Sequence, residues 1–457
     1  MMGFHERDQG QFFYDFCLDE VVPGDHLVRR LADVVDLSWV RGELSGYYSH
    51  TGRPSIDPEL LIRMLLVGYV FALRSERQLC AEVQVNLALR WFCGLGIEDR
   101  VPDHSAFCRA RHERFGDGKA YRRVFERVVG TCIDRGLVGG ASMSIDASHI
   151  RADVNQTRRI DGDDPITWPQ REQASRAVRE YLDHLEETAA VTTERNRTPA
   201  RPRALSLSDP LAAWVAKKNQ RAIFAYDANY LIDNEHGIIV DAEGTRANRV
   251  EEIAVARTMV ARTADTFGLK PRSLAGDTVY GAGRLLKWLT EREIEPHIPV
   301  WDRSQRGDGL FSRDEFTFEA TRNVYICPAG HELTTSGTID QGRTVSYRGR
   351  KRTCADCSLR SRCTSGPDAR KIARDIDEAV RDRVRALAGT PAFGYSARQR
   401  KKVEMAFAHL KRILKMDRLR LRGLSGARYE VLLAATAQNL RKLARYAAPP
   451  SAAQTPA

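Results

Sequence analysis

The sequence predicts a helical N-terminal region followed by an α/β domain built on a mixed sheet. Apolar residues recur at helical spacing through residues 1–136, and alternating strand patterns begin at residue 141. From there the elements run strand, strand, strand, helix, strand, helix, strand, an order typical of an α/β core. Two inserts interrupt this core, at residues 155–218 and 302–394.

Composition favours an ordinary globular protein with a polyanionic partner. Of the 457 residues, 42% are hydrophobic and 29% charged, and the net charge is +11, which favours nucleic acid as the partner. The most apolar run, residues 60–73, contains Arg63 and is too short to span a bilayer. Because the N-terminus is polar, we expect no signal peptide and no membrane association.

The N-terminal region is expected to resemble a helix-turn-helix module. Asp57-Pro58-Glu59 is a typical helix start, with an N-cap acid followed by proline. The expected helices are 57–70, 76–92, one beginning near 103 or 105, and 119–135. Because the third carries Arg109 and Arg111, we expect it to bind DNA; the alternative is a helical bundle with a charged outer face.

The α/β core contains two acids at positions typical of functional sites. The expected core elements are strands 141–150, 222–232, 237–241, 273–275 and 297–300, and helices 249–267 and 283–292. A charged helix, at about 169–193, is expected in the first insert. Asp146 lies within the first strand in an apolar context, where a charge is costly unless it is paired or binds metal. Asp277 follows a strand at a glycine-bearing turn, where open sheets present functional groups.

Residues 398–422 form the most basic stretch, with ten Lys and Arg residues against two acids. Apolar residues at helical spacing predict a buried stripe, formed by Val403, Phe407, Leu410 and Leu414. Arg400, Glu404 and Lys411 fall on roughly one helix face. This pattern fits either a solvated, salt-bridged face or a metal-binding carboxylate flanked by phosphate-binding cations.

Three carboxylates can therefore converge, Asp146 and Asp277 from strands and Glu404 from a helix packed on the sheet. Taken singly, each Asp is more often a turn or capping acid. Together they suit two Mg²⁺ ions, which prefer oxygen ligands and support phosphoryl transfer.

A cysteine cluster predicts a structural zinc site in the second insert. Its four cysteines are Cys327, Cys354, Cys357 and Cys363. Cys-x2-Cys with two distant cysteines suits tetrahedral zinc, and His331 could replace one ligand. The alternative is a reduced cluster without metal in a reducing compartment.

Three motifs, SIDASHIRAD, GDTVYGAG and RKKVEMAFAHLKR, resemble the acidic motifs of bacterial insertion-sequence DDE transposases. RPSIDPELLIRMLLVGY and PDHSAFCRARHERF are similar to the helical domain that precedes the catalytic domain in that family. The Cys-bearing insert before the Glu also resembles one branch of it. The resemblance extends over nearly the whole chain, from about residue 8 to about residue 446.

This resemblance implies an RNase H-like catalytic domain that binds Mg²⁺ or Mn²⁺, two per site, through Asp146, Asp277 and Glu404. It implies binding of terminal inverted repeats, hydrolysis at the element ends and attack of the 3′-hydroxyls on target DNA. In the family's Tyr-Arg-Glu-Lys helix signature, Arg400 and Lys411 match the phosphate-binding cations. Ala397 occupies the Tyr position, and Tyr395 lies two residues away. A homodimer on DNA, in the bacterial cytoplasm at the nucleoid, follows from the same resemblance.

The expected domain organisation follows from these elements. It comprises a helical DNA-binding domain, 1–136; the first part of the catalytic domain, 137–301; a Cys-rich insert, 302–394; the Glu helix with a closing helix, 395–446; and a disordered tail, 447–457. Trp301 is expected in the core or at an edge, with base stacking as the alternative. Two other functions stay open: a catalytically inactive, transposase-derived repressor, and an RNase H-like nuclease.

Overall fold

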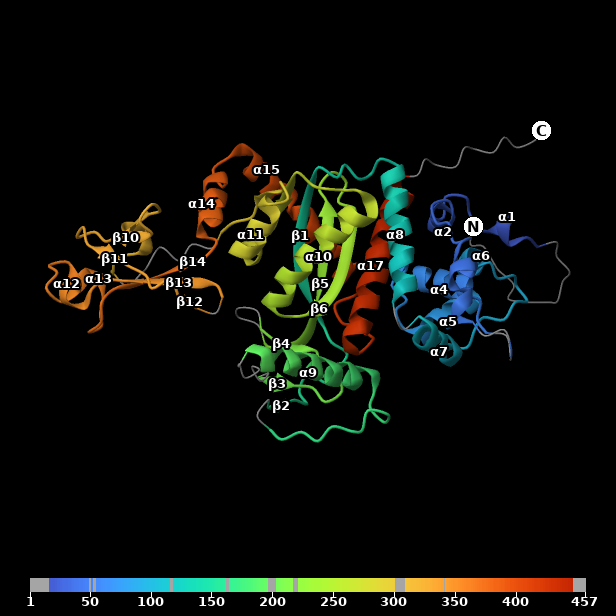
Figure 1. The fold of residues 1–457 in the computed structure, drawn as a ribbon. Coiled ribbons are helices and arrows are strands. Elements are labelled where there is room, and N and C mark those ends of the chain that lie inside the picture. The colour runs from blue at the N-terminus through green and yellow to red at the C-terminus, as the bar shows by residue number, and fades with distance from the viewer. Residues whose placement is uncertain are drawn as a thin grey trace, which may run out of the picture. The chain divides into compact units, whose positions relative to one another are not determined.

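The computed structural model describes residues 16–48, 51, 55–115, 118–161, 164–195, 203–216, 221–300, 309–340 and 342–446. Trp301 and the predicted tail, 447–457, lie outside them. The elements, which Figure 1 colours in chain order, form two compact units. The first comprises residues 1–132, 410–421 and 429–457, and the second comprises residues 133–409 and 422–428.

The N-terminal part of the first unit is helical, as predicted. Its helices are α1 (Leu18–Val21), α2 (Leu27–Ala32), α3 (Val40–Leu44), α4 (Pro58–Val70), α5 (Glu76–Val85), α6 (Leu87–Cys93), α7 (His104–Arg114) and α8 (Lys119–Asp134). The Asp57 carboxylate accepts a hydrogen bond from the Glu59 N–H at 2.8 Å, and Asp103 accepts one from the Ser105 N–H at 2.8 Å. Both predicted helix starts are therefore confirmed, because each acid is the N-cap.

The prediction of a single helix over 76–92 is wrong, because the helix is interrupted at Asn86. This residue has extended backbone angles, φ −97° and ψ 111°, and its side chain accepts a hydrogen bond from the Leu89 N–H at 3.2 Å. Asn86 thus ends α5 and caps α6, a role that suits its short polar side chain. Gly94, with φ 68°, ends α6 where the sequence predicts a stop.

A buried ion pair holds the C-terminal residues of the first unit. Arg74 pairs with Glu430, and their side chains are 5% and 1% exposed. Arg74 also donates hydrogen bonds to the carbonyls of Lys415 and Arg418, at 3.1 and 2.6 Å. Glu430 lies in α17 (Gly423–Tyr446), the predicted closing helix. The pair therefore ties the turn after the basic helix to the N-terminal helices.

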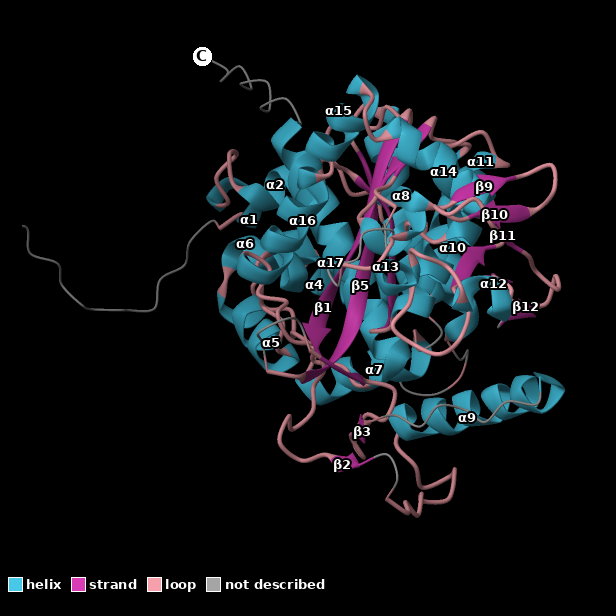
Figure 2. Cartoon of the chain, turned by 90° about the vertical axis from the view of Figure 1, so that its left-hand side faces the viewer, coloured by secondary structure: helices cyan, strands magenta, loops and turns pink. Residues whose placement is uncertain are grey.

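A mixed sheet forms the centre of the second unit, as predicted. Its strands are β1 (Ser142–Arg151), β4 (Ala213–Val215), β5 (Ile223–Asp233), β6 (Ile239–Arg246), β7 (Ser273–Ala275) and β8 (Glu295–His297). The order is β4-β5-β1-β7-β8, and β6 also pairs with β5. β5 runs antiparallel to β1, whereas β7 runs parallel to it. Figure 2 shows β1 and β5 side by side as the longest strands.

Two helices cover one face of this sheet. α10 (Arg249–Phe267) has the bounds that the sequence predicts, and α11 is Gly283–Thr290. Their apolar sides join a buried cluster with Met143, Ile145 and Leu231 of the strands. Because this cluster anchors β1 and β7, it fixes the strand ends that carry the candidate acids.

The basic stretch divides into two helices, α15 (Pro391–Gln399) and α16 (Lys401–Arg412), with Arg400 between them. All four residues of the predicted stripe are buried: Val403, Phe407, Leu410 and Leu414. Phe407 stacks on Tyr230 of β5, with ring centroids 4.7 Å apart. His297 lies 2.6 Å from the Ser396 hydroxyl. These contacts pack both helices on the sheet.

The two inserts add small elements to the second unit. The first holds β2 (Ile160–Asp161), α9 (Arg176–Arg195) and β3 (Ala204–Leu205). The second holds β9 (Thr317–Glu319), β10 (Val324–Ile326), β11 (Glu332–Leu333), β12 (Ile339–Asp340), β13 (Thr344–Arg348), α12 (Lys351–Ala355), α13 (Arg360–Cys363), β14 (Lys371–Asp375) and α14 (Glu378–Leu387). α9 begins later than the predicted residue 169. In the described parts of the chain, no helix has the length and apolarity needed to cross a membrane.

Candidate functional site

Parallel strand pairing sets Asp146 and Asp277 side by side. Ser144 of β1 pairs with Ala275 of β7, and each acid lies two residues further along its own strand. Because the strands run parallel, that equal spacing places the two acids at the same level. The Asp277 carboxylate accepts a hydrogen bond from the Val279 N–H at 2.8 Å, which fixes the turn after β7.

Arg400 connects the strand acids to the helix acid. Its guanidinium lies 3.4 Å from Asp146 Oδ2 and 2.9 Å from Glu404 Oε1. Glu404 is 51% exposed in the first turn of α16, whereas Asp146 is 15% exposed. The structure therefore brings together the three acids that the sequence singled out, with one cation between two of them.

The remaining residues of the predicted helix signature divide between the two helices. Lys411 lies in α16 and is half-buried. Tyr395 and Ala397 lie in α15, and Tyr395 is 54% exposed. Since α15 ends at Gln399 and α16 begins at Lys401, these two residues lie on a different helix from Glu404.

The site is short of positive charge. Burial raises the pKa of Asp146 to about 6, the hydrogen bond from the Ala147 N–H lowers it, and the charge of Asp277 raises it again. Arg400 lowers this pKa, and Glu404 raises it. One guanidinium therefore does not offset the repulsion among the acids, as expected at sites that hold cations.

Sequence reasoning missed a fourth acid, Glu252 of α10. Burial raises its pKa to about 7; a hydrogen bond with Tyr280 lowers it, and the charges of Asp227, Asp277 and Asp146 raise it. Glu252 occupies the first turn of its helix, where an acid is usually explained by the helix dipole. That position gives no sequence signal for a site.

Asp227 was also missed, although it fits the criterion that selected Asp146. It lies within β5, is 2% exposed and hydrogen-bonds to His149, its cross-strand partner on β1. A charged residue within a buried strand was the available signal. The imidazole explains how this carboxylate is accommodated.

The N-terminal arginines differ in their surroundings. Arg109 is exposed on α7. Arg111 is buried, with a side chain 9% exposed, and lies 2.5 Å from Glu76 of α5. Its burial corrects the expectation that it contacts DNA, because the guanidinium holds two helices together. Of these two N-terminal arginines, Arg109 is therefore the candidate DNA contact.

The four cysteines of the second insert line one pocket. Together with His331 they surround a cavity of about 340 Å³. The Cys327 sulfur accepts a hydrogen bond from the His331 N–H at 3.3 Å. Burial raises the pKa of Cys363, Arg370 lowers it and the other three cysteines raise it. Within the described residues, however, no three His, Cys, Asp or Glu side chains form a ready-made set of metal ligands.

Comparison with known proteins yields two family matches. Residues 16–113 match the family described as "Transposase domain (DUF772)", and residues 326–444 match the family described as "Transposase DDE domain". The second match includes Glu404 and the cysteine pocket, whereas Asp146 and Asp277 lie between the two. No curated protein matches the chain. Both matches are to transposase domains, and together they support an insertion-sequence DDE transposase.

Proposed function

We propose that the protein binds the terminal inverted repeats of its element, cleaves DNA at the element ends and joins them to target DNA. The observation that carries this proposal is the position of Asp146 and Asp277 at the same level of two parallel strands. Arg400 lies between Asp146 and Glu404 and forms an ion pair with each. Carboxylates from two strands and a helix are a suitable arrangement for phosphoryl transfer. We also propose that the sheet and its helices form an RNase H-like domain.

Asp146, Asp277 and Glu404 would hold two Mg²⁺ or Mn²⁺ ions. Their oxygen donors suit hard cations, and burial, with a smaller effect of the neighbouring acids, raises the pKa of Asp146. Bound there, the ions would activate the attacking oxygen and stabilise the leaving oxygen of a phosphodiester. The half-buried Arg400 guanidinium would contact the phosphate, and so orient it against the acids.

The family implies DNA as the partner, and its contacts are proposed from cations on α7 and α16. Arg109 would bind the terminal repeat, and Lys411 would bind backbone phosphates near the cleaved end. Two ends must be held together for joining, so we propose a homodimer on DNA.

A structural zinc ion is proposed for the cysteine pocket. Cys327, Cys354, Cys357 and Cys363 supply the thiolates that a structural zinc site uses, with His331 as a possible replacement for one of them. The thiols line one cavity but must draw together to bind one ion. Zinc would thus fix the loops of the second insert.

The test is cleavage of a labelled duplex carrying the element's own end, with Mg²⁺, by wild type and Glu404→Gln. We expect cleavage at the element boundary that falls by about 10³-fold or more in the variant, because members of a catalytic set do not replace one another. Glu291→Gln, an exposed acid at the end of α11, is the matched control and should cleave like wild type.

Two other results would overturn parts of the proposal. Specific binding without cleavage by wild type would favour a transposase-derived repressor. Cleavage without joined products would favour an RNase H-like nuclease, since a plain nuclease makes no strand-transfer products.

A further inference from the structure

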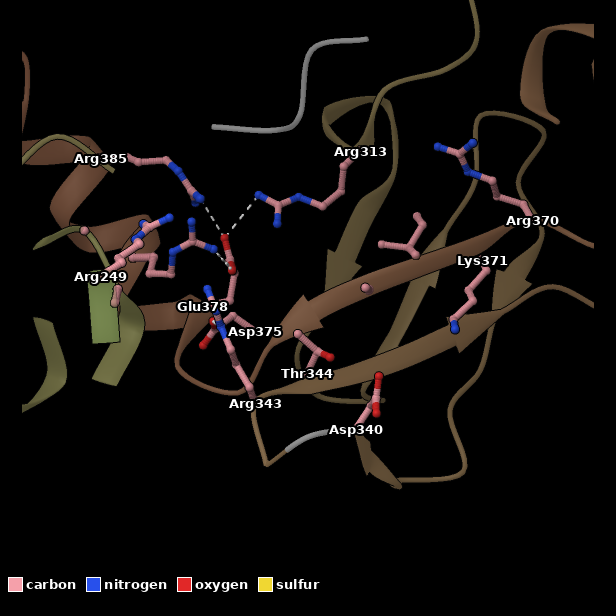
Figure 3. A pocket seen from close by; sticks show the side chains of 15 residues that line it. Arg249, Arg313, Asp340, Arg343, Thr344, Arg370, Lys371, Asp375, Glu378 and Arg385 are labelled. Atoms are coloured by element: carbon pink, nitrogen blue, oxygen red, sulfur yellow. Dashed lines mark hydrogen bonds and ion pairs between the residues drawn. The ribbon is translucent and has the colours of Figure 1, made fainter. Parts of the chain in front are cut away.

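A cationic pocket lies beside the turn that carries Asp277. Its volume is about 460 Å³, and all the residues that line it belong to the second unit. One wall is formed by Gly281 and Ala282, which follow that turn. The other walls come from the strands β13 and β14 of the second insert and from α14 (Figure 3).

The charge of this pocket is strongly positive. Among the described residues that line it are seven cations, Arg249, Arg313, Arg343, Arg370, Lys371, Arg381 and Arg385. The acids are Asp340, Asp375 and Glu378. Even with every acid ionised, a net charge of about four remains to be balanced by an anionic ligand or by solvent.

Glu378 organises three of the guanidiniums at the centre of the pocket. It is 1% exposed and lies 3.1 Å from Arg313, 2.6 Å from Arg381 and 2.7 Å from Arg385. Figure 3 shows Arg313 and Arg385 pointing toward its carboxylate, each joined to it by a dashed line. Burial alone would raise the pKa of Glu378, but the hydrogen bond from Arg385 and the neighbouring arginines lower it. The carboxylate thus holds the cations in a defined arrangement without neutralising them.

Two further cations are accessible at this pocket. Arg343 has a side chain 64% exposed and lies 3.3 Å from the buried Asp375. Lys371 begins β14 and is exposed. Exposed cations beside half-buried, ion-paired guanidiniums suit a phosphodiester, because charge-assisted bonds to phosphate are strong and Arg presents a planar set of donors.

The pocket is held rigidly against the candidate catalytic elements. Arg249, the first residue of α10, lies with its guanidinium 3.5 Å from the Val279 carbonyl, in the turn that Asp277 caps. A Cβ added at Gly283 would come within 2.7 Å of Asp375 Oδ1. Since α11 approaches the insert this closely, a ligand in the pocket has a defined position relative to Asp277.

We propose that this pocket binds a backbone phosphate of the DNA strand whose end enters the site of Asp146, Asp277 and Glu404. The inference rests on the proposed function. It adds a DNA contact made by residues outside the three acidic motifs. Phosphate contacts fix register without reading sequence, so the pocket sets how far a strand extends past the acids.

The test is the salt dependence of binding to a terminal-end duplex, measured by fluorescence anisotropy with Ca²⁺ in place of Mg²⁺. For Arg343→Gln/Lys371→Gln we expect the slope of log K against log salt to fall by about 1, since each phosphate contact contributes about 0.9. Affinity near 0.1 M salt should fall by about tenfold. Ethylation of the phosphate that the pocket holds should weaken binding of wild type by about tenfold and leave binding of this variant nearly unchanged.

Lys270→Gln/Arg383→Gln removes the same charge and is the matched control. Lys270 precedes β7 and pairs with Glu293, whereas Arg383 is exposed on α14 between the two pocket arginines of that helix. Equal slopes for the two double variants would overturn the proposal. Arg343→Lys/Lys371→Arg keeps the charge and should restore the slope, which separates a lost phosphate contact from a misfolded insert.

Binding is measured without cleavage, so failure of the pocket and failure of the proposed function are distinguishable. If Glu404→Gln abolishes cleavage as expected but the pocket double variant has the salt slope of wild type, only the pocket proposal is wrong. If wild type never cleaves but Arg343→Gln/Lys371→Gln still lowers the salt slope, the pocket proposal stands and the proposed nuclease activity is wrong.

Discussion

The charge of Asp146 opposes folding of the metal-free protein. Burial is the largest cause of its raised pKa, about 6, and the nearby acids add to it. The folded state therefore binds the Asp146 proton more tightly than the unfolded chain, in which Asp ionises near 3.9. By linkage, this residue's contribution to stability is complete below about pH 4 and is lost as pH rises to about 6.

We predict that Asp146→Asn stabilises the metal-free protein at pH 8 by about 1–3 kcal/mol, because the amide removes the buried charge. The gain should vanish below about pH 4, where the wild-type carboxyl is protonated in both states. Urea unfolding in EDTA across pH 4–8 measures this, with Glu291→Gln as the exposed control. A variant less stable than wild type at pH 8 would show that the carboxylate is held by stronger contacts than Arg400 supplies.

The sequence identifies a site residue when its position is unusual for its type. Asp146 within an apolar strand, and Asp277 at a strand end before a glycine turn, were found in this way. Glu252 was not, because an acid in the first turn of a helix is ordinary. Arg111 was misassigned, since a basic residue on an amphipathic helix has the same spacing whether it faces solvent or Glu76.

At the scale of elements, most helices and strands follow from periodicity, and the exceptions follow from capping. The bounds of α10 and β7 agree with the sequence. Asn86 splits a predicted helix because its side chain offers the backbone an alternative partner. The break at Arg400 has no such signal, because the residue lies inside a continuous helical pattern and tertiary packing sets the boundary.

The Cys-bearing insert has a small buried core. Its described buried cluster comprises Phe311, Phe316, Tyr325, Leu333, Tyr347 and Ile372. A bound metal can add folding energy to such a lobe, and the cysteines of the chain form no disulfide in the described structure.

We therefore predict that removal of zinc by a chelator loosens residues 327–363 before the core sheet. Hydrogen exchange should accelerate in the insert while β1 and β5 stay protected, because metal binding supplies folding energy to its own lobe. Cys354→Ser/Cys357→Ser should reproduce the effect, with Cys17→Ser, an exposed thiol outside the pocket, as control. Protein isolated without zinc and with equal protection in the insert would contradict the assignment.

At the scale of the whole molecule, topology assembles sites that no stretch of sequence reveals. The cationic pocket draws on five separate segments of the second unit, 249, 281–282, 313, 340–344 and 370–385. No arginine taken alone gives a sequence signal for a site. Each of the three acids has a local signal in the sequence, whereas the pocket depends on how the insert docks on α11.

The division into two units predicts that DNA binding and cleavage are separable. Arg109 belongs to the first unit, whereas Asp146, Asp277 and Glu404 belong to the second. Arg109→Ala should weaken binding of the terminal repeat by about tenfold and lower its salt slope by about 1, because one cationic contact is lost. At saturating protein it should cleave at the wild-type rate, the reverse of Glu404→Gln.

The matched control is Arg123→Ala on α8, an exposed arginine that lies 3.5 Å from Glu43. It should change neither affinity nor slope, since an exposed ion pair contributes little. If Arg109→Ala leaves affinity and slope unchanged, α7 does not read DNA and the N-terminal helices are a scaffold. If it slows cleavage at saturation instead, the first unit acts on the chemical step, and binding and catalysis are not divided between the units.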